Sequence, residues 1–137
     1  MKKGVNYLKF EDLPAIPRGN GIVNKPIAYK KIGAQSIHSG ITHMPPHSKV
    51  PPHSHNAEEQ VTVLQGTLKI ILDGDTEVVC SKFDSTFLTE GVQHELINET
   101  DDEVIAMVTY GRGDVNRTFS ASGKTVEIGG DDDQFPQ

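Results

Sequence analysis

Three histidines and one glutamate are spaced so that they can bind a single metal ion. His53 and His55 are two residues apart, Glu59 follows them closely, and His94 lies far downstream. Side chains of an extended segment alternate between two faces, so His53 and His55 point to the same side. Three imidazoles and one carboxylate suit a divalent transition metal such as Mn, Fe, Co, Ni or Zn, whereas calcium prefers oxygen ligands. These four residues therefore predict one transition-metal site.

Short strands are predicted along most of the chain, each bounded by turn residues. Asp73-Gly74 between two apolar runs is typical of a type I′ hairpin, and no segment shows sustained helical periodicity. We therefore expect an all-β fold. The predicted strands are 27–32, 36–44, 59–65, 67–73, 75–80, 86–88, 94–98 and 103–110, with shorter candidates at 7–10, 117–119 and 125–128.

Two motifs of this sequence resemble those of the cupin family. The first motif is matched by His53, His55, Glu59 and Gly66, and the second by Gly91, His94 and Asn98. The resemblance covers about residues 35–110 and implies a double-stranded β-helix, or jelly-roll, barrel in a small single-domain metal-binding protein. It also implies that His53, His55, Glu59 and His94 are the metal ligands, and it suggests a homodimer with N-terminal strands packing across the interface.

The sequence departs from the cupin motifs at three positions. His47 and Phe83 stand where the two motifs begin with glycine, and Thr89 stands where the second motif has proline. All three are turn or packing positions in the family, not ligand positions. The departures therefore concern loop shape and cavity lining, and every position that binds metal in the family is filled.

The chain is predicted to form one barrel domain with two flanking segments. Residues 1–26 are interpreted as an irregular entry with a candidate edge strand, residues 27–128 as the barrel, and residues 129–137 as an acidic tail. The run Asp131-Asp132-Asp133 in that tail favours a solvated, disordered segment through self-repulsion. A chain of 137 residues is long enough to bury one core.

Composition and charge narrow the range of partners. The net charge is −6 and basic residues do not cluster, so a nucleic-acid partner is not expected. No apolar run approaches the length needed to span a membrane, and residues 4–9 lack the apolar core of a signal peptide. We therefore expect a cytoplasmic protein without a membrane partner.

Other side chains are candidates for the wall of a metal-centred cavity. Alternation along residues 37–43 predicts that Ile37, Ile41 and His43 face inward, so His43 is the candidate catalytic acid or base. Tyr29 and Tyr110 are further candidates for the cavity, whereas His47 is expected to be exposed at a turn.

Three functions are compatible with this pattern. The complete ligand set favours a small metal-dependent enzyme of the dioxygenase, lyase or isomerase type that acts on a small polar organic substrate bound at the metal. Four protein ligands leave about two positions open on an octahedral ion, as catalytic sites require. The alternative is a non-catalytic protein that binds a sugar or an organic acid through the metal. A structural or storage role is disfavoured, because it would not need the ligands.

Overall fold

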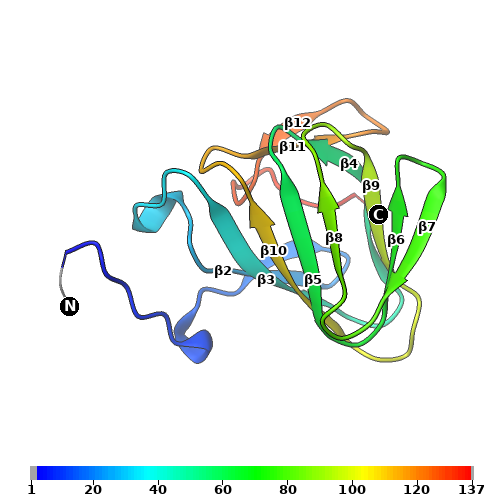
Figure 1. Cartoon of the computed structure of the whole chain (residues 1–137), viewed down its shortest axis with the longest axis horizontal. Helices are drawn as coiled ribbons and strands as arrows, with labels where there is room; N and C mark the ends of the chain where they lie inside the picture. The colour runs from blue at the N-terminus through cyan, green and yellow to red at the C-terminus, as the bar shows by residue number, and fades with distance from the viewer. Residues whose placement is uncertain (1–2, 137) are drawn as a thin grey trace.

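The computed structural model describes residues 3–136, which form two facing antiparallel β-sheets (Figure 1). The first sheet has the strand order β1-β2-β3-β10-β5-β8 and the second has the order β12-β11-β4-β9-β6-β7. This architecture confirms the predicted all-β jelly roll. The strands are β1 Ile16–Gly19, β2 Ile22–Pro26, β3 His38–Met44, β4 Ser48–His55, β5 Glu59–Gln65, β6 Leu68–Leu72, β7 Thr76–Cys80, β8 Ser85–Leu88, β9 His94–Asn98, β10 Val104–Tyr110, β11 Asn116–Phe119 and β12 Thr125–Glu127.

The core lies between the two sheets and is built from the inward-facing residues of each strand. Alternation is clearest in β5, where Glu59, Val61 and Val63 are buried while the residues between them are more exposed. Leu68 and Ile70 of β6 extend this core from the opposite sheet. The face that begins at Glu59 thus continues as an apolar floor, as the sequence predicts.

Three secondary-structure predictions were wrong. The predicted strand at 27–32 is absent, and a short 3-10 helix, η2 (Lys30–Ile32), lies there instead. The candidate edge strand at 7–10 is also absent, because residues 5–9 form no ladder and η1 (Phe10–Asp12) follows them. Strand β4, which carries His53 and His55, was not among the predicted strands.

Turns place non-glycine residues in the left-handed region at both positions where the cupin motifs have glycine. His47 has φ of 58° and Phe83 has φ of 74°. Such a conformation costs roughly 1–2 kcal/mol for a residue with a Cβ atom. The backbone shape of both turns is therefore retained without glycine. Asp73 and Gly74 have φ of 53° and 78°, which agrees with the predicted type I′ hairpin.

Both ends of the chain contribute to the barrel. The segment taken as irregular contains β1 and β2, which extend the first sheet beside β3. The prediction that the acidic tail is solvated and disordered was wrong, because Asp133 is only 1% exposed and Phe135 is 5% exposed. Two buried arginines near Asp133 outweigh the self-repulsion of the acidic run.

The division into an entry segment (1–26), a barrel (27–128) and a tail (129–137) stays a proposal. The entry segment already contains two strands of the first sheet, β1 and β2. Residues 5–9 extend beyond the two sheets (Figure 1), while the ring of Phe10 lies beside His43 of β3. No helix within residues 3–136 is long and apolar enough to cross a membrane.

Candidate metal centre and cavity

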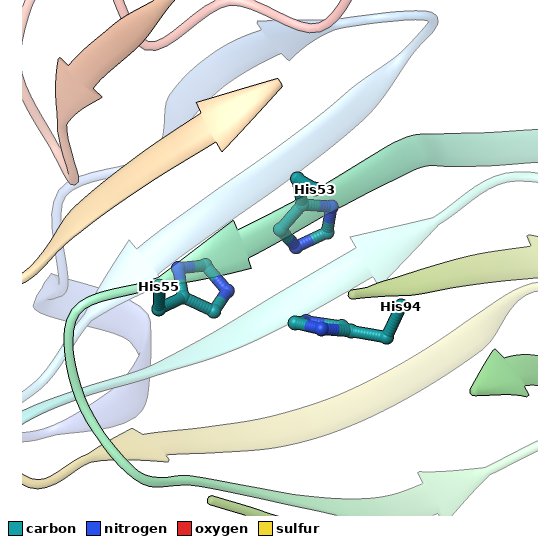
Figure 2. A group of neighbouring side chains, drawn as sticks. All are labelled: His53, His55 and His94. Carbon is teal, nitrogen blue, oxygen red and sulfur yellow. The ribbon is translucent and has the colours of Figure 1, made fainter. Parts of the chain in front are cut away.

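Four side chains from both sheets meet at one end of the barrel. His53 and His55 extend from β4, and His53 is paired in register with His94 of the neighbouring strand β9. Glu59 comes from the opposite sheet, where it begins β5. The three imidazoles face one another (Figure 2), with centroid separations of 4.2 Å for His53–His94, 4.8 Å for His53–His55 and 5.0 Å for His55–His94.

A backbone carbonyl fixes the tautomer of each imidazole. The Nδ1 atoms of His53, His55 and His94 lie 2.7, 2.9 and 3.0 Å from the carbonyl oxygens of Pro51, Asn116 and Val92. A carbonyl oxygen only accepts hydrogen bonds, so each Nδ1 carries the proton and donates. The lone pair of each neutral ring is therefore on Nε2. A second hydrogen bond of this kind is typical of metal-binding histidines.

The free nitrogens converge with the carboxylate of Glu59. One ring nitrogen of each histidine lies within 4.8 Å of those of the other two. The Nε2 atoms of His55 and His94 lie 3.2 and 3.0 Å from Oε2 and Oε1 of Glu59. Despite these short distances, both Nε2 atoms and Oε1 are buried without an aligned hydrogen-bond partner. Lone pairs this close repel unless a cation or a proton lies between them, so the residues fit a bound metal ion.

The buried cluster shifts the pKa values of Glu59, His53 and His94 in different directions. Burial raises the pKa of the Glu59 carboxyl, but the charge of His94 and the close imidazoles outweigh it, so this pKa lies well below its usual range. Burial lowers the pKa of His53 well below its ordinary value, and His94 lowers it further. For His94, burial lowers the pKa, and the charge of Glu59 more than offsets this and raises it overall. Without metal, His94 thus takes up a proton before His53 does.

A cavity of about 70 Å³ adjoins the cluster, and His53 and Glu59 form part of its wall. By the same measure, one water needs roughly 10–15 Å³, so the cavity has room for several waters or a small organic molecule. Its wall combines apolar side chains with a few polar ones, as ligand pockets do. The polar lining includes Arg18, Asn24, Tyr29, His38, Thr42, Tyr110 and Arg117, and the apolar lining includes Ile16, Ile41, Val50, Leu96 and Val108.

The prediction that His43 faces the cavity was wrong. His43 is absent from the cavity wall and lies on the outer face of β3, where its Nδ1 is 3.6 Å from Oε1 of Glu103 and its ring is 6.0 Å from that of Phe10. Ile37, expected on the same inward face, is 45% exposed. His47 is exposed, as predicted, and its Nε2 lies 2.7 Å from Oδ1 of Asp101.

His38 is the cavity imidazole that the sequence pattern missed. It begins β3 and lies between Tyr29 and Tyr110, with ring centroids 6.3 and 5.8 Å away. Burial lowers the pKa of His38, so the ring is neutral near pH 7. Tyr29 and Tyr110 both line the cavity, as expected. Gly40 and Thr42, which share the parity of His38, also line the cavity, but neither is apolar enough to mark this face as inward in the sequence.

Asn98, the last residue of the second motif, has a structural role. Its fully buried amide donates to the carbonyl oxygens of Met44, Pro45 and Asp102 at 2.8–3.1 Å, and its Oδ1 accepts from Thr100. These bonds tie the end of β9 to the turn before β4. The second motif thus supplies one candidate ligand, His94, and one residue that holds the loops near it.

Comparison with known proteins relates the whole barrel to solved structures. No curated protein sequence matches the chain. The polyketide cyclase RemF from Streptomyces resistomycificus is 17% identical, with a TM-score of 0.72 over 87% of this chain and 89% of that one. An RmlC-like cupin from Shewanella frigidimarina is 16% identical, with a TM-score of 0.70 over 82% and 95% of the two chains.

A sugar phosphate isomerase of the cupin superfamily from Silicibacter pomeroyi is 16% identical, with a TM-score of 0.71 over 96% of this chain and all of that one. At such identities, these similarities show a shared fold. The family model of the cupin domain matches residues 40–110, which is more than half of the sequence and includes all four clustered residues. The chain therefore belongs to the cupin domain family.

Proposed function

We propose that this protein is a metal-dependent enzyme that converts a small polar organic molecule, by isomerisation or elimination, in the cavity beside His53 and Glu59. The observation that carries the proposal is the convergence of three imidazoles whose Nδ1 atoms are held by carbonyls, with the Nε2 atoms of His55 and His94 facing Glu59. A divalent transition ion (Mn, Fe, Co, Ni or Zn) held by His53, His55, Glu59 and His94 supplies a Lewis acid that polarises a carbonyl or carboxylate oxygen.

His38 supports a reaction that moves a proton. It is a neutral imidazole in the cavity wall, because burial lowers its pKa. A neutral imidazole can accept a proton from a carbon next to a carbonyl and return it elsewhere on the same molecule. Isomerases and lyases need this step, so His38 favours these two reaction classes over a dioxygenase. The family fold accommodates such chemistry, since similar structures include a cyclase and an isomerase.

Tyr110 supports substrate orientation more than proton transfer. Its side chain is buried beside His55, with ring centroids 4.7 Å apart. Burial raises the pKa of the Tyr110 hydroxyl far above its ordinary value, and the charge of Glu59 raises it further. The hydroxyl therefore stays protonated, and it can donate a hydrogen bond to a substrate oxygen but cannot serve as a base near pH 7.

Elemental analysis of protein purified without added metal tests the site, and a substrate screen with that metal tests the reaction. We expect one transition ion per chain, turnover that disappears on chelation, and recovery on returning the same metal. The His94→Ala variant should lose stoichiometric metal. The His38→Gln variant should keep the metal and lose about 10²- to 10⁴-fold in kcat.

The exposed His47 offers a matched control, because His47→Gln removes an imidazole outside the cavity. This variant should keep both metal and turnover. Conversion at an unchanged rate by metal-free protein would contradict the proposal. Metal-dependent binding of sugars or organic acids without turnover would support the alternative, a non-catalytic binding protein.

We also propose that the protein is a homodimer in which residues 5–10 pack against the second copy. The support is a group of apolar side chains that the described chain leaves in solvent. Val5, Tyr7 and Phe10 are 55%, 71% and 50% exposed. Apolar groups gathered on one segment are typical of an interaction site, whereas scattered ones are ordinary.

A further inference from the structure

Arg117 is a buried cation that has no role in the proposed reaction. It lies in β11, is 5% exposed and lines the cavity. One end of the guanidinium, Nη1, forms an ion pair with Asp133. Its Nε is buried without an aligned hydrogen-bond partner among the described residues, and the Tyr110 hydroxyl is the neutral group that interacts with this guanidinium. A buried donor without an acceptor costs about 1–3 kcal/mol, more for a charged group, so such atoms commonly serve a ligand.

The surroundings hold Arg117 in place next to the metal cluster. The face of its guanidinium lies 4.6 Å from the ring centroid of Phe135, which restrains the side chain by a cation–π contact. In the sheet, Arg117 is the register partner of His55, and Phe119 is that of His53. Its positive charge reaches the cluster, since it contributes to lowering the pKa of His53.

The positive charges in the cavity wall exceed the carboxylates that pair with them. Arg18 and Arg117 are 2% and 5% exposed, and a single carboxylate, Asp133, lies between them. Asp133 pairs with Arg117 through Oδ1, while its Oδ2 accepts from the backbone N–H of Gly129 and is 4.0 Å from Nε of Arg18.

The other hydrogen bonds of Arg18 go to neutral groups, and the exposed Asp131 acts on it through its charge without an ion pair among the described residues. Its Nε donates to Oδ1 of Asn24 at 3.3 Å, and its Nη1 donates to the carbonyl of Gly130 at 3.1 Å. Glu59 does not compensate the two guanidinium groups, because its carboxylate faces His55 and His94. Among the described residues, the two guanidinium groups thus share one ion-paired carboxylate, and one positive charge in the cavity wall is left without its own.

We infer that Arg117, backed by Arg18, forms a subsite that binds the carboxylate of a small organic acid. This inference rests on the proposed function, because it names an organic acid as the substrate class. A guanidinium binds carboxylates through a planar fork of N–H donors, and a single excess charge matches a single carboxylate. The cavity of about 70 Å³ limits the acid to a few non-hydrogen atoms.

The test measures binding of acetate, glycolate and malonate by isothermal titration calorimetry to the metal-free and metal-loaded full chain. Acetamide and ethylene glycol serve as neutral comparisons, and inorganic phosphate serves as a different anion. We expect the carboxylates to bind in both forms of the protein and the neutral molecules not to bind. The Arg117→Gln variant should weaken carboxylate binding at least tenfold, because it removes a charge-assisted hydrogen bond.

Two further variants keep the test decisive if Arg117→Gln destabilises the fold. Asp133→Asn removes the internal carboxylate and leaves both guanidinium groups, so it should tighten carboxylate binding severalfold. Arg112→Gln removes an equal charge from an exposed arginine paired with Asp114, and it should leave the affinity unchanged. Circular dichroism confirms that each variant is folded.

Unchanged affinity in both Arg117→Gln and Asp133→Asn would overturn the inference, and so would tighter binding of phosphate than of every carboxylate. These outcomes are separate from failure of the proposed function. Carboxylate binding to the metal-free chain depends on Arg117 and not on the metal cluster. Turnover that persists with chelator present would overturn the proposed function alone.

Discussion

A backbone carbonyl behind each imidazole decides what the histidine cluster can do. Two of these carbonyls belong to residues two positions before the histidine, Pro51 for His53 and Val92 for His94, so the local chain sets the tautomer. With each proton held on Nδ1, three lone pairs are directed into one space. A hydrogen-bonded network without a ligand would instead pair these nitrogens with donors. The cluster is therefore arranged for a cation.

Acidification should destabilise the fold through His38. Burial lowers the pKa of His38 in the folded chain, and Arg117 and Arg18 add to this shift while Asp133 and Glu127 oppose it. Because the unfolded pKa is about 6.5, stability from neutral His38 is fully present above that pH and is lost as pH falls through the folded pKa.

The measurement is the free energy of unfolding in urea for the wild type and for His38→Gln, in metal-free protein over a range of pH. The wild type should lose stability relative to the variant as the pH falls from above 6.5. The metal ligands titrate equally in both proteins and cancel in the difference. Parallel pH curves for the two proteins would show that His38 is solvated.

The sequence predicted the cluster well and the rest of the cavity poorly, for a physical reason. His53 and His55 share a face because strand alternation is fixed, and their motif sets the spacing to Glu59. In β3, the inward face had to be chosen from hydrophobicity. Ile41 shares the parity of His43 and is apolar, so hydrophobicity favoured His43 over His38 as the inward residue. Choosing the wrong parity assigned His43 to the cavity and left out His38, although Ile41 does line the cavity.

Strand β4 shows why the most important element was missing from the predicted strands. Pro51 and Pro52 lie in its middle, and proline removes a donor from a β-ladder. The structure accommodates them where the register with β9 shifts, between Val50 and His53. Bulges of this kind are frequent beside active sites, because they re-aim side chains. The register shift at the two prolines, which made the strand unrecognisable in the sequence, therefore lies next to His53.

The C-terminal segment should contribute to stability as an element of the barrel. Phe135 is buried against Arg117, and its backbone N–H donates to the carbonyl of Arg18. Phe135→Ala should lower the free energy of unfolding by roughly 1–3 kcal/mol. This is less than the about 3–5 kcal/mol of a central phenylalanine, because a terminal segment can detach without unfolding the sheets.

Urea denaturation of Phe135→Ala beside Phe87→Ala checks this prediction. Phe87 is 62% exposed in β8, so its truncation should change stability by no more than about 0.5 kcal/mol. Equal effects of the two substitutions would mean that the C-terminal segment is not docked in solution. The backbone of Phe135 lies so close to Gly19 that a Cβ atom there would be 2.7 Å from the carbonyl oxygen of Phe135. This close contact agrees with a C-terminal segment that is docked on the barrel.

At the scale of the whole molecule, the net charge conceals the chemistry of the cavity. The chain carries −6, yet the cavity wall has an excess positive charge at Arg18 and Arg117. Most acidic residues are at least partly exposed, and the buried ones are Glu59 in the metal cluster and Asp133, which the tail brings inside. Composition led us to expect no nucleic-acid partner, but it could not predict the proposed anion subsite, because that subsite depends on which few charges the fold buries.

The exposed N-terminal segment leads to a prediction about the assembly. Residues 5–9 extend beyond the sheets (Figure 1) and keep Tyr7 71% exposed and Val5 55% exposed. Removing apolar surface of this kind from water is worth about 25 cal/mol per Å², so a second copy that covers it stabilises the dimer.

We expect a dimer in sedimentation velocity at micromolar concentration, weakened in a Val5→Ser/Tyr7→Ser double variant. Val79→Ser, which changes an equally exposed residue of β7, should leave the dimer intact. A wild-type monomer at this concentration would contradict the proposal, because the apolar segment would then remain uncovered in solution.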